Sequence, residues 1–188
     1  KALIRDLMMR EGDENTDRIG TFQMEISNWK NAMLAPDRAI QQAKNPDDLF
    51  LANIYSMYNR YLKAYNALDF DDLILKPVEL FNDHPDILSK WQLKIRYLLV
   101  DEYQDTNIAQ YELVKQIVGD RHALTVVGDD DQSIYSWRGA RPENLAKLEE
   151  DFPSLKLIKL EQNYRSTSLI LRSANKLIAN NPHMFDKA

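Results

Sequence analysis

The 188-residue sequence contains no cysteine, which excludes disulfide bonds, thiolate metal sites and cysteine nucleophiles. Its apolar runs are only a few residues long and its start lacks a secretory signal, so we expect neither a membrane span nor export. With no cysteine and no signal, a cytoplasmic location is expected. The first residue is Lys1 rather than methionine, which indicates that residues upstream are missing.

Positive charge is also scarce. Lysine and arginine total 24 against 29 aspartates and glutamates, and the formal net charge is −5. A strongly basic surface, the usual compositional sign of a nucleic-acid partner, is therefore not expected. Any role with nucleic acid must rest on particular residues. The hydrophobic content of 44% is sufficient for a core, and the length allows one domain or parts of two.

The first 68 residues are expected to be mainly helical. Four apolar residues recur at helical spacing after an expected loop at 11–20: Phe22, Ile26, Trp29 and Met33. Pro36 is expected to end or interrupt that helix. Asn45-Pro46-Asp47 is a helix-start pattern. The tyrosine-rich stripe that follows is interpreted as a packed helix face; a surface that stacks bases is the alternative.

After residue 68, two short helices are expected up to Lys94, divided near His84-Pro85, and apolar runs then alternate with helices. Strands are expected at 95–100, 124–128 and 155–160. Helices are expected at 108–118, capped by Asp105 or Thr106 and stopped by Gly119, from Pro142 to 152, and from Ser166 to 180–182. This alternation predicts an α/β fold with a parallel sheet.

The first candidate site follows the expected strand at 95–100. Residues 97–100 are continuously apolar, as in a strand covered on both faces, and run directly into Asp101-Glu102. In an ATPase, an acid at this strand end holds Mg²⁺ and a second carboxylate can orient and deprotonate the attacking water. Asp101 would then hold the magnesium and Glu102 would be the general base. A solvated acidic turn is the alternative.

The second candidate site follows the expected strand at 124–128. Three aspartates, 129–131, precede Gln132, and Tyr135, Trp137 and Arg138 follow closely. The acids by themselves suit a metal site or a solvated turn. Gln132 could hydrogen-bond a phosphate oxygen or water. Aromatic rings beside an arginine can stack bases and touch the backbone of single-stranded DNA, although their spacing alone favours packing in a core.

The third candidate site lies where the expected strand at 155–160 gives way to a helix. Arg165 could supply positive charge to a developing γ-phosphate, and Tyr164 could stack on adenine. The alternative is ordinary helix-entry chemistry, with Ser166 as the cap and Arg165 in solvent.

These three segments, in this order, resemble conserved motifs of the UvrD/Rep-type superfamily-one ATP-dependent DNA helicases; within that family the Rep branch is more similar than the UvrD branch. Residues 98–107 resemble the D-E-x-Q box, residues 128–140 the third motif and residues 161–166 the fourth. The resemblance implies that Asp101 binds Mg²⁺, Glu102 is the catalytic base, and Gln132 and Arg165 contact the γ-phosphate of ATP. It further implies that Tyr164 stacks on adenine, and that DNA is bound by Tyr135, Trp137 and Arg138.

The resemblance also implies a partial P-loop NTPase (RecA-like) fold. Residues 1–68 would be part of a helical insertion in the first motor domain, 69–160 the second half of that domain, and 161–188 the start of the second motor domain. The family's G-x-x-x-x-G-K-[S/T] phosphate loop is absent, because none of the five glycines is followed by lysine. Weak or absent ATP hydrolysis is therefore expected of this chain alone.

Three functions remain open on these residues. The first is part of a bacterial helicase that uses ATP and Mg²⁺ to move along single-stranded DNA and unwind duplex junctions in replication or repair, 3′ to 5′ by resemblance. The second is a metal-dependent nuclease using Asp101, Glu102 and the aspartates at 129–131. The third is a non-catalytic interaction module on a degenerate ATPase fold. Protein partners are not indicated.

Overall fold

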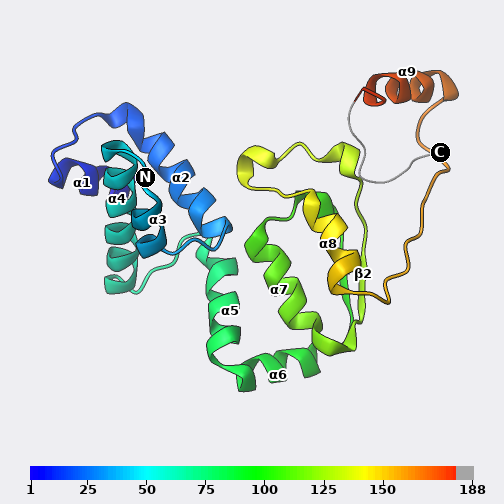
Figure 1. The fold of residues 1–188 in the computed structure, drawn as a ribbon, viewed down its shortest axis with the longest axis horizontal. Coiled ribbons are helices and arrows are strands. Elements are labelled where there is room, and N and C mark those ends of the chain that lie inside the picture. Colours follow the sequence, from blue (N-terminus) through cyan, green and yellow to red (C-terminus); the bar gives the residue numbers. More distant parts are fainter. Residues whose placement is uncertain (181–188) are drawn as a thin grey trace.

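A computed structural model describes residues 1–180 of the chain, in which helices predominate over a small sheet (Figure 1). Helices α1 to α4 form one group at the N-terminal side. Helices α5 and α6 lead from this group to two strands with α7 and α8 packed nearby, and the chain then extends to α9. No helix in the described part is long and apolar enough to cross a membrane.

The N-terminal group, here called the helical region (residues 1–68), has its own core. It consists of α1 (Ala2–Arg10), a 3-10 turn (Thr16–Arg18), α2 (Ile19–Asn31), α3 (Pro36–Gln42) and α4 (Pro46–Ala64). Apolar residues from all four helices meet in one buried cluster: Ile4, Leu7, Met8, Phe22, Ile26, Ala39, Ala52, Ile54 and Tyr55. The rings of Trp29 and Tyr55 lie 5.4 Å apart beside this cluster.

Most expectations for the helical region are confirmed, with shifted boundaries. The predicted start at Asn45-Pro46 is correct, because the Asn45 side chain accepts a hydrogen bond from the Asp48 amide. Pro36 does not end α2; it begins α3, since proline suits a first helical turn. The expected loop at 11–20 already contains the 3-10 turn and the start of α2. Tyr55 packs in the core as interpreted, whereas Tyr65 is 64% exposed.

Helices α5 (Asp72–Asp83) and α6 (Pro85–Lys94) match the two short helices expected before Lys94. They are joined to the helical region by a buried ion-pair cluster. Lys30 of α2 donates to Asp69 at 2.6 Å and lies 3.0 Å from Asp72, and its side chain is fully enclosed. A lysine so enclosed is stable as a charge only because two carboxylates face it.

The sheet consists of β1 (Leu98–Val100) and β2 (Leu124–Val126), which are parallel with Leu98 opposite Leu124 and Val100 opposite Val126. The connecting helix α7 spans Ile108–Val118, as predicted. Its cap is Asn107 rather than Asp105 or Thr106: the Asn107 side chain accepts from the Gln110 amide and the Gln110 side chain accepts from the Asn107 amide. Gly119 ends the helix at φ +52°, as predicted.

One face of this sheet is covered and the other is not. Leu98, Val100, Leu124 and Val126 pack against a cluster that includes Tyr111 of α7 and Leu148 of α8 (Glu143–Asp151), whereas Leu99 on the opposite face is 74% exposed. The expectation that residues 97–100 are covered on both faces is therefore wrong for the described part of the chain. Within the described residues, α7 and α8 both pack on the face that carries Leu98, Val100, Leu124 and Val126.

The predicted third strand at 155–160 is also wrong. Within residues 1–180 the sheet contains only β1 and β2, and residues 155–160 form no strand. Leu155 packs against the core of the sheet region, but Leu157, Ile158 and Leu160 are exposed, with Leu160 at 86%. A strand needs a neighbour to complete its hydrogen bonds, and an apolar pattern alone does not provide one. The last helix, α9 (Ser168–Ile178), begins two residues after the expected Ser166; part of its expected end, residues 181–182, lies outside the described residues.

Candidate functional site

The first two sequence motifs lie side by side because they follow neighbouring parallel strands. The Val127 amide donates to the Val100 carbonyl at 2.8 Å, and the Tyr103 amide donates to the Val127 carbonyl at 2.9 Å. These two bonds continue the β1–β2 pairing into the loops. Asp101 and Glu102 therefore lie beside the segment that leads to Asp129, at the sheet edge where ligands bind in open α/β folds.

Asp101 and Glu102 are both exposed at this edge. The Glu102 amide donates to Asp101 Oδ1 at 2.9 Å, and Glu102 has a left-handed backbone, with φ 49° and ψ 45°. A left-handed conformation is uncommon for a residue with a long side chain. It turns the chain sharply after β1, so the two carboxylates are presented by a tight turn rather than by an extended segment. An exposed carboxylate oxygen is a suitable Mg²⁺ ligand, directly or through water.

Gln104 connects the two motifs and was not singled out by the sequence. Its side chain is buried, with Nε2 donating to Glu102 Oε2 at 2.8 Å and Oε1 accepting from the Asp129 amide at 3.0 Å. A Cβ at Gly128 would lie 3.0 Å from Gln104 Oε1, so glycine allows this close approach. The signal that could have identified Gln104 is its fixed place in the D-E-x-Q segment.

The hydrogen bonds that connect the two motifs through Gln104 continue from Asp129 to Gln132. The Gln132 side-chain amide donates to Asp129 Oδ2 at 2.8 Å, and its backbone amide donates to the Asp129 carbonyl at 3.0 Å. A continuous hydrogen-bonded path thus runs from Glu102 through Gln104 and Asp129 to Gln132. The expected general base and the expected phosphate contact are joined by this path.

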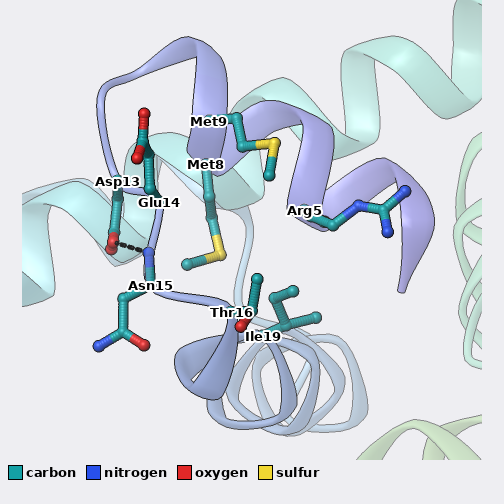
Figure 2. A pocket seen from close by; sticks show the side chains of 8 residues that line it. All are labelled: Arg5, Met8, Met9, Asp13, Glu14, Asn15, Thr16 and Ile19. Atoms are coloured by element: carbon teal, nitrogen blue, oxygen red, sulfur yellow. Dashed lines mark hydrogen bonds between the residues drawn. The ribbon is translucent and has the colours of Figure 1, made fainter.

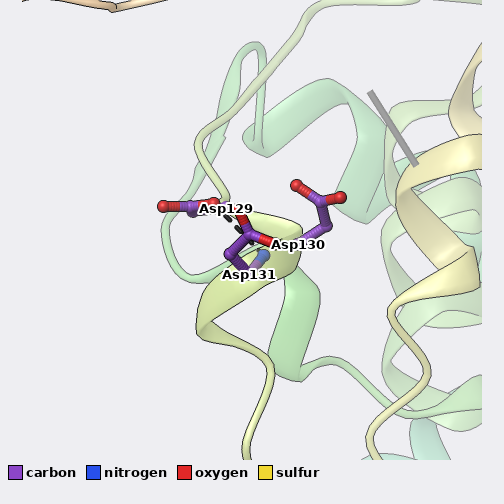
Figure 3. A group of neighbouring side chains, drawn as sticks. All are labelled: Asp129, Asp130 and Asp131. Carbon is purple, nitrogen blue, oxygen red and sulfur yellow. Dashed lines mark hydrogen bonds between the residues drawn. The ribbon is translucent and has the colours of Figure 1, made fainter. Parts of the chain in front are cut away.

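The three aspartates at 129–131 gather on one 3-10 turn (Figure 3). Their carboxylate oxygens lie within 4.8 Å of one another, and the Asp131 amide donates to Asp129 Oδ1 at 3.2 Å. Within the described residues, Asp101 and Glu102 are not members of this group. The aspartates at 129–131 thus form one carboxylate group, and Asp101 and Glu102 form another at the end of the neighbouring strand. Nearby, burial and the Glu102 charge raise the pKa of Asp105.

The aromatic pair and the arginine of the second motif form a compact exposed group. The rings of Tyr135 and Trp137 are 6.4 Å apart, and the Arg138 guanidinium lies 4.4 Å from the Trp137 ring centre and 5.3 Å from that of Tyr135. Trp137 is 61% exposed, which argues against core packing. The exposed indole carries a stacked cation and retains free surface on which a base could lie.

The third motif is not brought to this site. Tyr164 is 88% exposed and Arg165 is exposed. The segment that carries them extends away from α8 towards α9 (Figure 1). Asn163 Oδ1 accepts from the backbone amides of Arg165 and Ser166 in a local turn. Arg165 is in solvent, as the helix-entry alternative expected, but the residue before α9 is Thr167, so Ser166 is not the cap.

A shallow surface depression lies elsewhere, at the beginning of the helical region (Figure 2). It has no room for a water molecule, and its walls carry none of the motif residues. Its lining residues are Arg5, Met8, Met9, Asp13, Glu14, Asn15, Thr16 and Ile19. The candidate site is consequently the exposed sheet edge, not an enclosed pocket.

Comparison with known proteins identifies a family. The family model for the UvrD/REP helicase N-terminal domain matches residues 1–153. The chain is 57% identical to ATP-dependent DNA helicase Rep of Escherichia coli strain K12 and 56% identical to that of Salmonella typhimurium, each over 99% of this chain and 28% of the relative. It is 46% identical to ATP-dependent DNA helicase PcrA of Staphylococcus aureus, over 96% of this chain and 25% of the relative.

The chain thus spans little more than a quarter of the length of these relatives. The matched region includes both motifs at the sheet edge, β1, β2 and the whole helical region. On these grounds the chain belongs to the UvrD/REP helicase family.

Proposed function

We propose that this chain carries part of the ATP-hydrolysis and DNA-contact machinery of a bacterial, cytoplasmic helicase that moves along single-stranded DNA. The observation that supports this function best is the hydrogen-bonded path from Glu102 to Gln132, with the exposed Trp137 only five residues further along the chain. A shift of this loop on phosphate contact would move the aromatic group. The relatives are named as ATP-dependent DNA helicases, which is consistent with this assignment.

Each residue has a definite role in the proposal. Asp101 holds Mg²⁺, which when bound neutralises charge on the transferring phosphate. Glu102 accepts a proton from the attacking water, and Gln104 holds its carboxylate in place. Gln132 exchanges its bond to Asp129 for one to the γ-phosphate. Trp137 stacks on a base.

The remaining parts of the proposal rest on the family. Tyr164 and Arg165 would reach the nucleotide only when a second motor domain closes on the first. That closure is the step that would convert hydrolysis into 3′-to-5′ movement and unwinding of duplex junctions. The domain division at residues 68 and 160, the RecA-like fold of the whole motor and the role in replication or repair belong to the same proposal.

The test is steady-state ATP hydrolysis with Mg²⁺, with and without single-stranded DNA, by the full-length protein that contains this chain. Glu102→Gln keeps the hydrogen bond from Gln104 but cannot accept the proton, so a loss of about 10²- to 10⁴-fold in DNA-stimulated kcat is expected. Glu79→Gln, an exposed acid on α5, is the matched control and should be unchanged. Wild-type turnover by Glu102→Gln would contradict the proposal.

The same ATPase assay on the 188-residue chain tests whether hydrolysis requires the phosphate loop that this sequence lacks. We expect weak or absent hydrolysis, because this sequence lacks the backbone amides and lysine that hold the phosphates. Mg²⁺-dependent cleavage of DNA without ATP would instead favour the nuclease.

A further inference from the structure

Asn31, the last residue of α2, connects the helical region to the motif segments. Its Oδ1 accepts a hydrogen bond from Asn107 Nδ2 at 3.0 Å, although the two residues are 76 positions apart. The other polar groups of Asn107 are already used: its Oδ1 and its backbone amide form the capping box of α7 with Gln110. The side-chain amide hydrogens of Asn107 therefore serve Asn31, and the capping box fixes their direction.

The loop that carries the aromatic residues (Tyr135–Arg138, here called the aromatic loop) ends beside these two asparagines. Gly139 directly follows Arg138 and has φ +84°, and a Cβ placed on it would lie 3.5 Å from Asn31 Cβ and 4.0 Å from Asn107 Cβ. A Cβ that glycine lacks would thus be at ordinary van der Waals distance from both asparagines, so the turn lies directly beside their side chains. The positive φ explains why a glycine stands at the turn.

The residues after Gly139 are hydrogen-bonded to Thr106, the neighbour of Asn107. The Arg141 amide donates to the Thr106 carbonyl at 2.9 Å, and the buried Asn144 side chain donates to the Thr106 carbonyl at 3.0 Å. The end of the second motif, residues 139–144, is thus positioned by its hydrogen bonds to Thr106 and by its place beside Asn107, at the end of the first motif. Asn31 is the contribution of the helical region to this junction.

Asn31 itself is held firmly. The preceding residue, Lys30, is enclosed by Asp69 and Asp72. Asn31 Nδ2 donates to Ser27 Oγ at 3.3 Å, one turn earlier in α2. A movement of α2 would therefore reach Asn107 and the turn at Gly139 through Asn31.

We propose that Asn31 is a positioning residue for DNA binding: from the helical region, through Asn107 and Gly139, it sets the placement of the Tyr135–Arg138 loop on single-stranded DNA. This inference rests on the proposed function, since it requires that Trp137 stacks on a base. It adds a residue outside the motifs that touches neither nucleotide nor DNA.

The experiment measures the affinity of the full-length protein for fluorescent oligo(dT) and for ATP. Asn31→Ala removes the hydrogen bonds to Asn107 and Ser27 and part of the loop's support, so oligo(dT) affinity should fall by about 3- to 10-fold while ATP affinity is unchanged. Asn107→Asp keeps the helix cap but cannot donate to Asn31, so it should give a similar loss. Gln23→Ala, exposed on the same helix, is the control and should bind as wild type.

A double-mutant cycle separates positioning from general stability. Trp137→Ala should weaken oligo(dT) binding by about 10-fold or more. If Asn31 acts through this loop, Asn31→Ala should add little in the Trp137→Ala background. Full additivity, or an equal loss of ATP affinity, would show a merely structural role and overturn the inference.

The two proposals fail in different ways. If Trp137→Ala weakens oligo(dT) binding and Asn31→Ala does not, the positioning role is wrong and the proposed function stands. If Trp137→Ala has no effect on oligo(dT) binding, the DNA-stacking role in the proposed function fails, and the positioning role fails with it.

Discussion

The helical region and the sheet region bury their apolar residues to different degrees. In the helical region, four helices enclose one cluster whose members are at most 4% exposed, including Leu7, Ile26 and Ile54. In the sheet region, β1 and β2 have an open face, on which Leu99 is 74% exposed, and Val127 just beyond β2 is 52% exposed. An apolar sheet face of this kind normally packs against other polypeptide.

The helical region therefore completes its own core, whereas the sheet region carries the motif residues. The helical region closes one core by itself, although some of its large apolar side chains, such as Tyr65 at 64%, remain exposed. The sheet region presents its motifs at one edge and leaves one face open. The junction between them is polar, formed by Lys30 with Asp69 and Asp72 and by Asn31 with Asn107.

The largest effect on stability is expected at this junction. Lys30→Met keeps most of the side-chain volume but leaves Asp69 and Asp72 facing each other without a cation. The free energy of unfolding at neutral pH should fall by about 3–5 kcal/mol, measured by urea denaturation of the 188-residue chain. Lys76→Met, which removes an exposed pair with Glu79, should change it by at most about 0.5 kcal/mol. Equal effects would mean that the two regions are not joined through Lys30.

A matched pair of leucines sharpens the contrast in packing. Leu7 is 1% exposed in the helical core and Leu99 is 74% exposed on the open sheet face. Leu7→Ala should cost about 2–5 kcal/mol of unfolding free energy, whereas Leu99→Ala should cost about 0.5 kcal/mol or less in this chain. A large cost for Leu99→Ala would show that its face is covered in solution, for example by a second copy of the chain.

The smallest effect is a dependence on pH. Burial alone would raise the pKa of Asp69, but the Lys30 ammonium and the Asp72 backbone amide hold it below its ordinary value. A lowered pKa contributes stability above the unfolded value of 3.8, and this contribution is lost as pH falls through the folded pKa. Asp69→Asn should therefore lose less stability than wild type between about pH 5 and pH 2 in urea titrations.

Asp71 is expected to have the opposite effect on how stability changes with pH. Burial raises its pKa above the ordinary value, with Ser27 and Asn31 offsetting part of the shift. Its charge is therefore a cost to folding above the unfolded pKa, and acid removes that cost. Asp71→Asn should be somewhat more stable than wild type at neutral pH. If Asp69→Asn and Asp71→Asn changed the pH profile in the same direction, the local electrostatic account would be wrong.

Local patterns predicted the elements that depend on nearby residues. The bounds of α7 were correct because an apolar helical pattern and Gly119 define them, although the cap is Asn107. The start of α4 at Asn45-Pro46 was correct for the same reason. The strand at 155–160 was wrong because an apolar run says nothing about whether a pairing neighbour is present. The placement of Tyr164 and Arg165 at the site remains a prediction.

The sequence by itself determined the family, the α/β alternation and the acids and aromatics that follow the strands, since these depend on residue types at short spacing. Only the tertiary structure decided which side chains link them. Gln104, which is also bonded to Glu102, reaches Asp129 across 25 residues, and Asn107 reaches Asn31 across 76. Hydrogen bonds between such distant positions leave no periodic trace in the chain, because they are set by how strands and helices pack rather than by neighbouring residues.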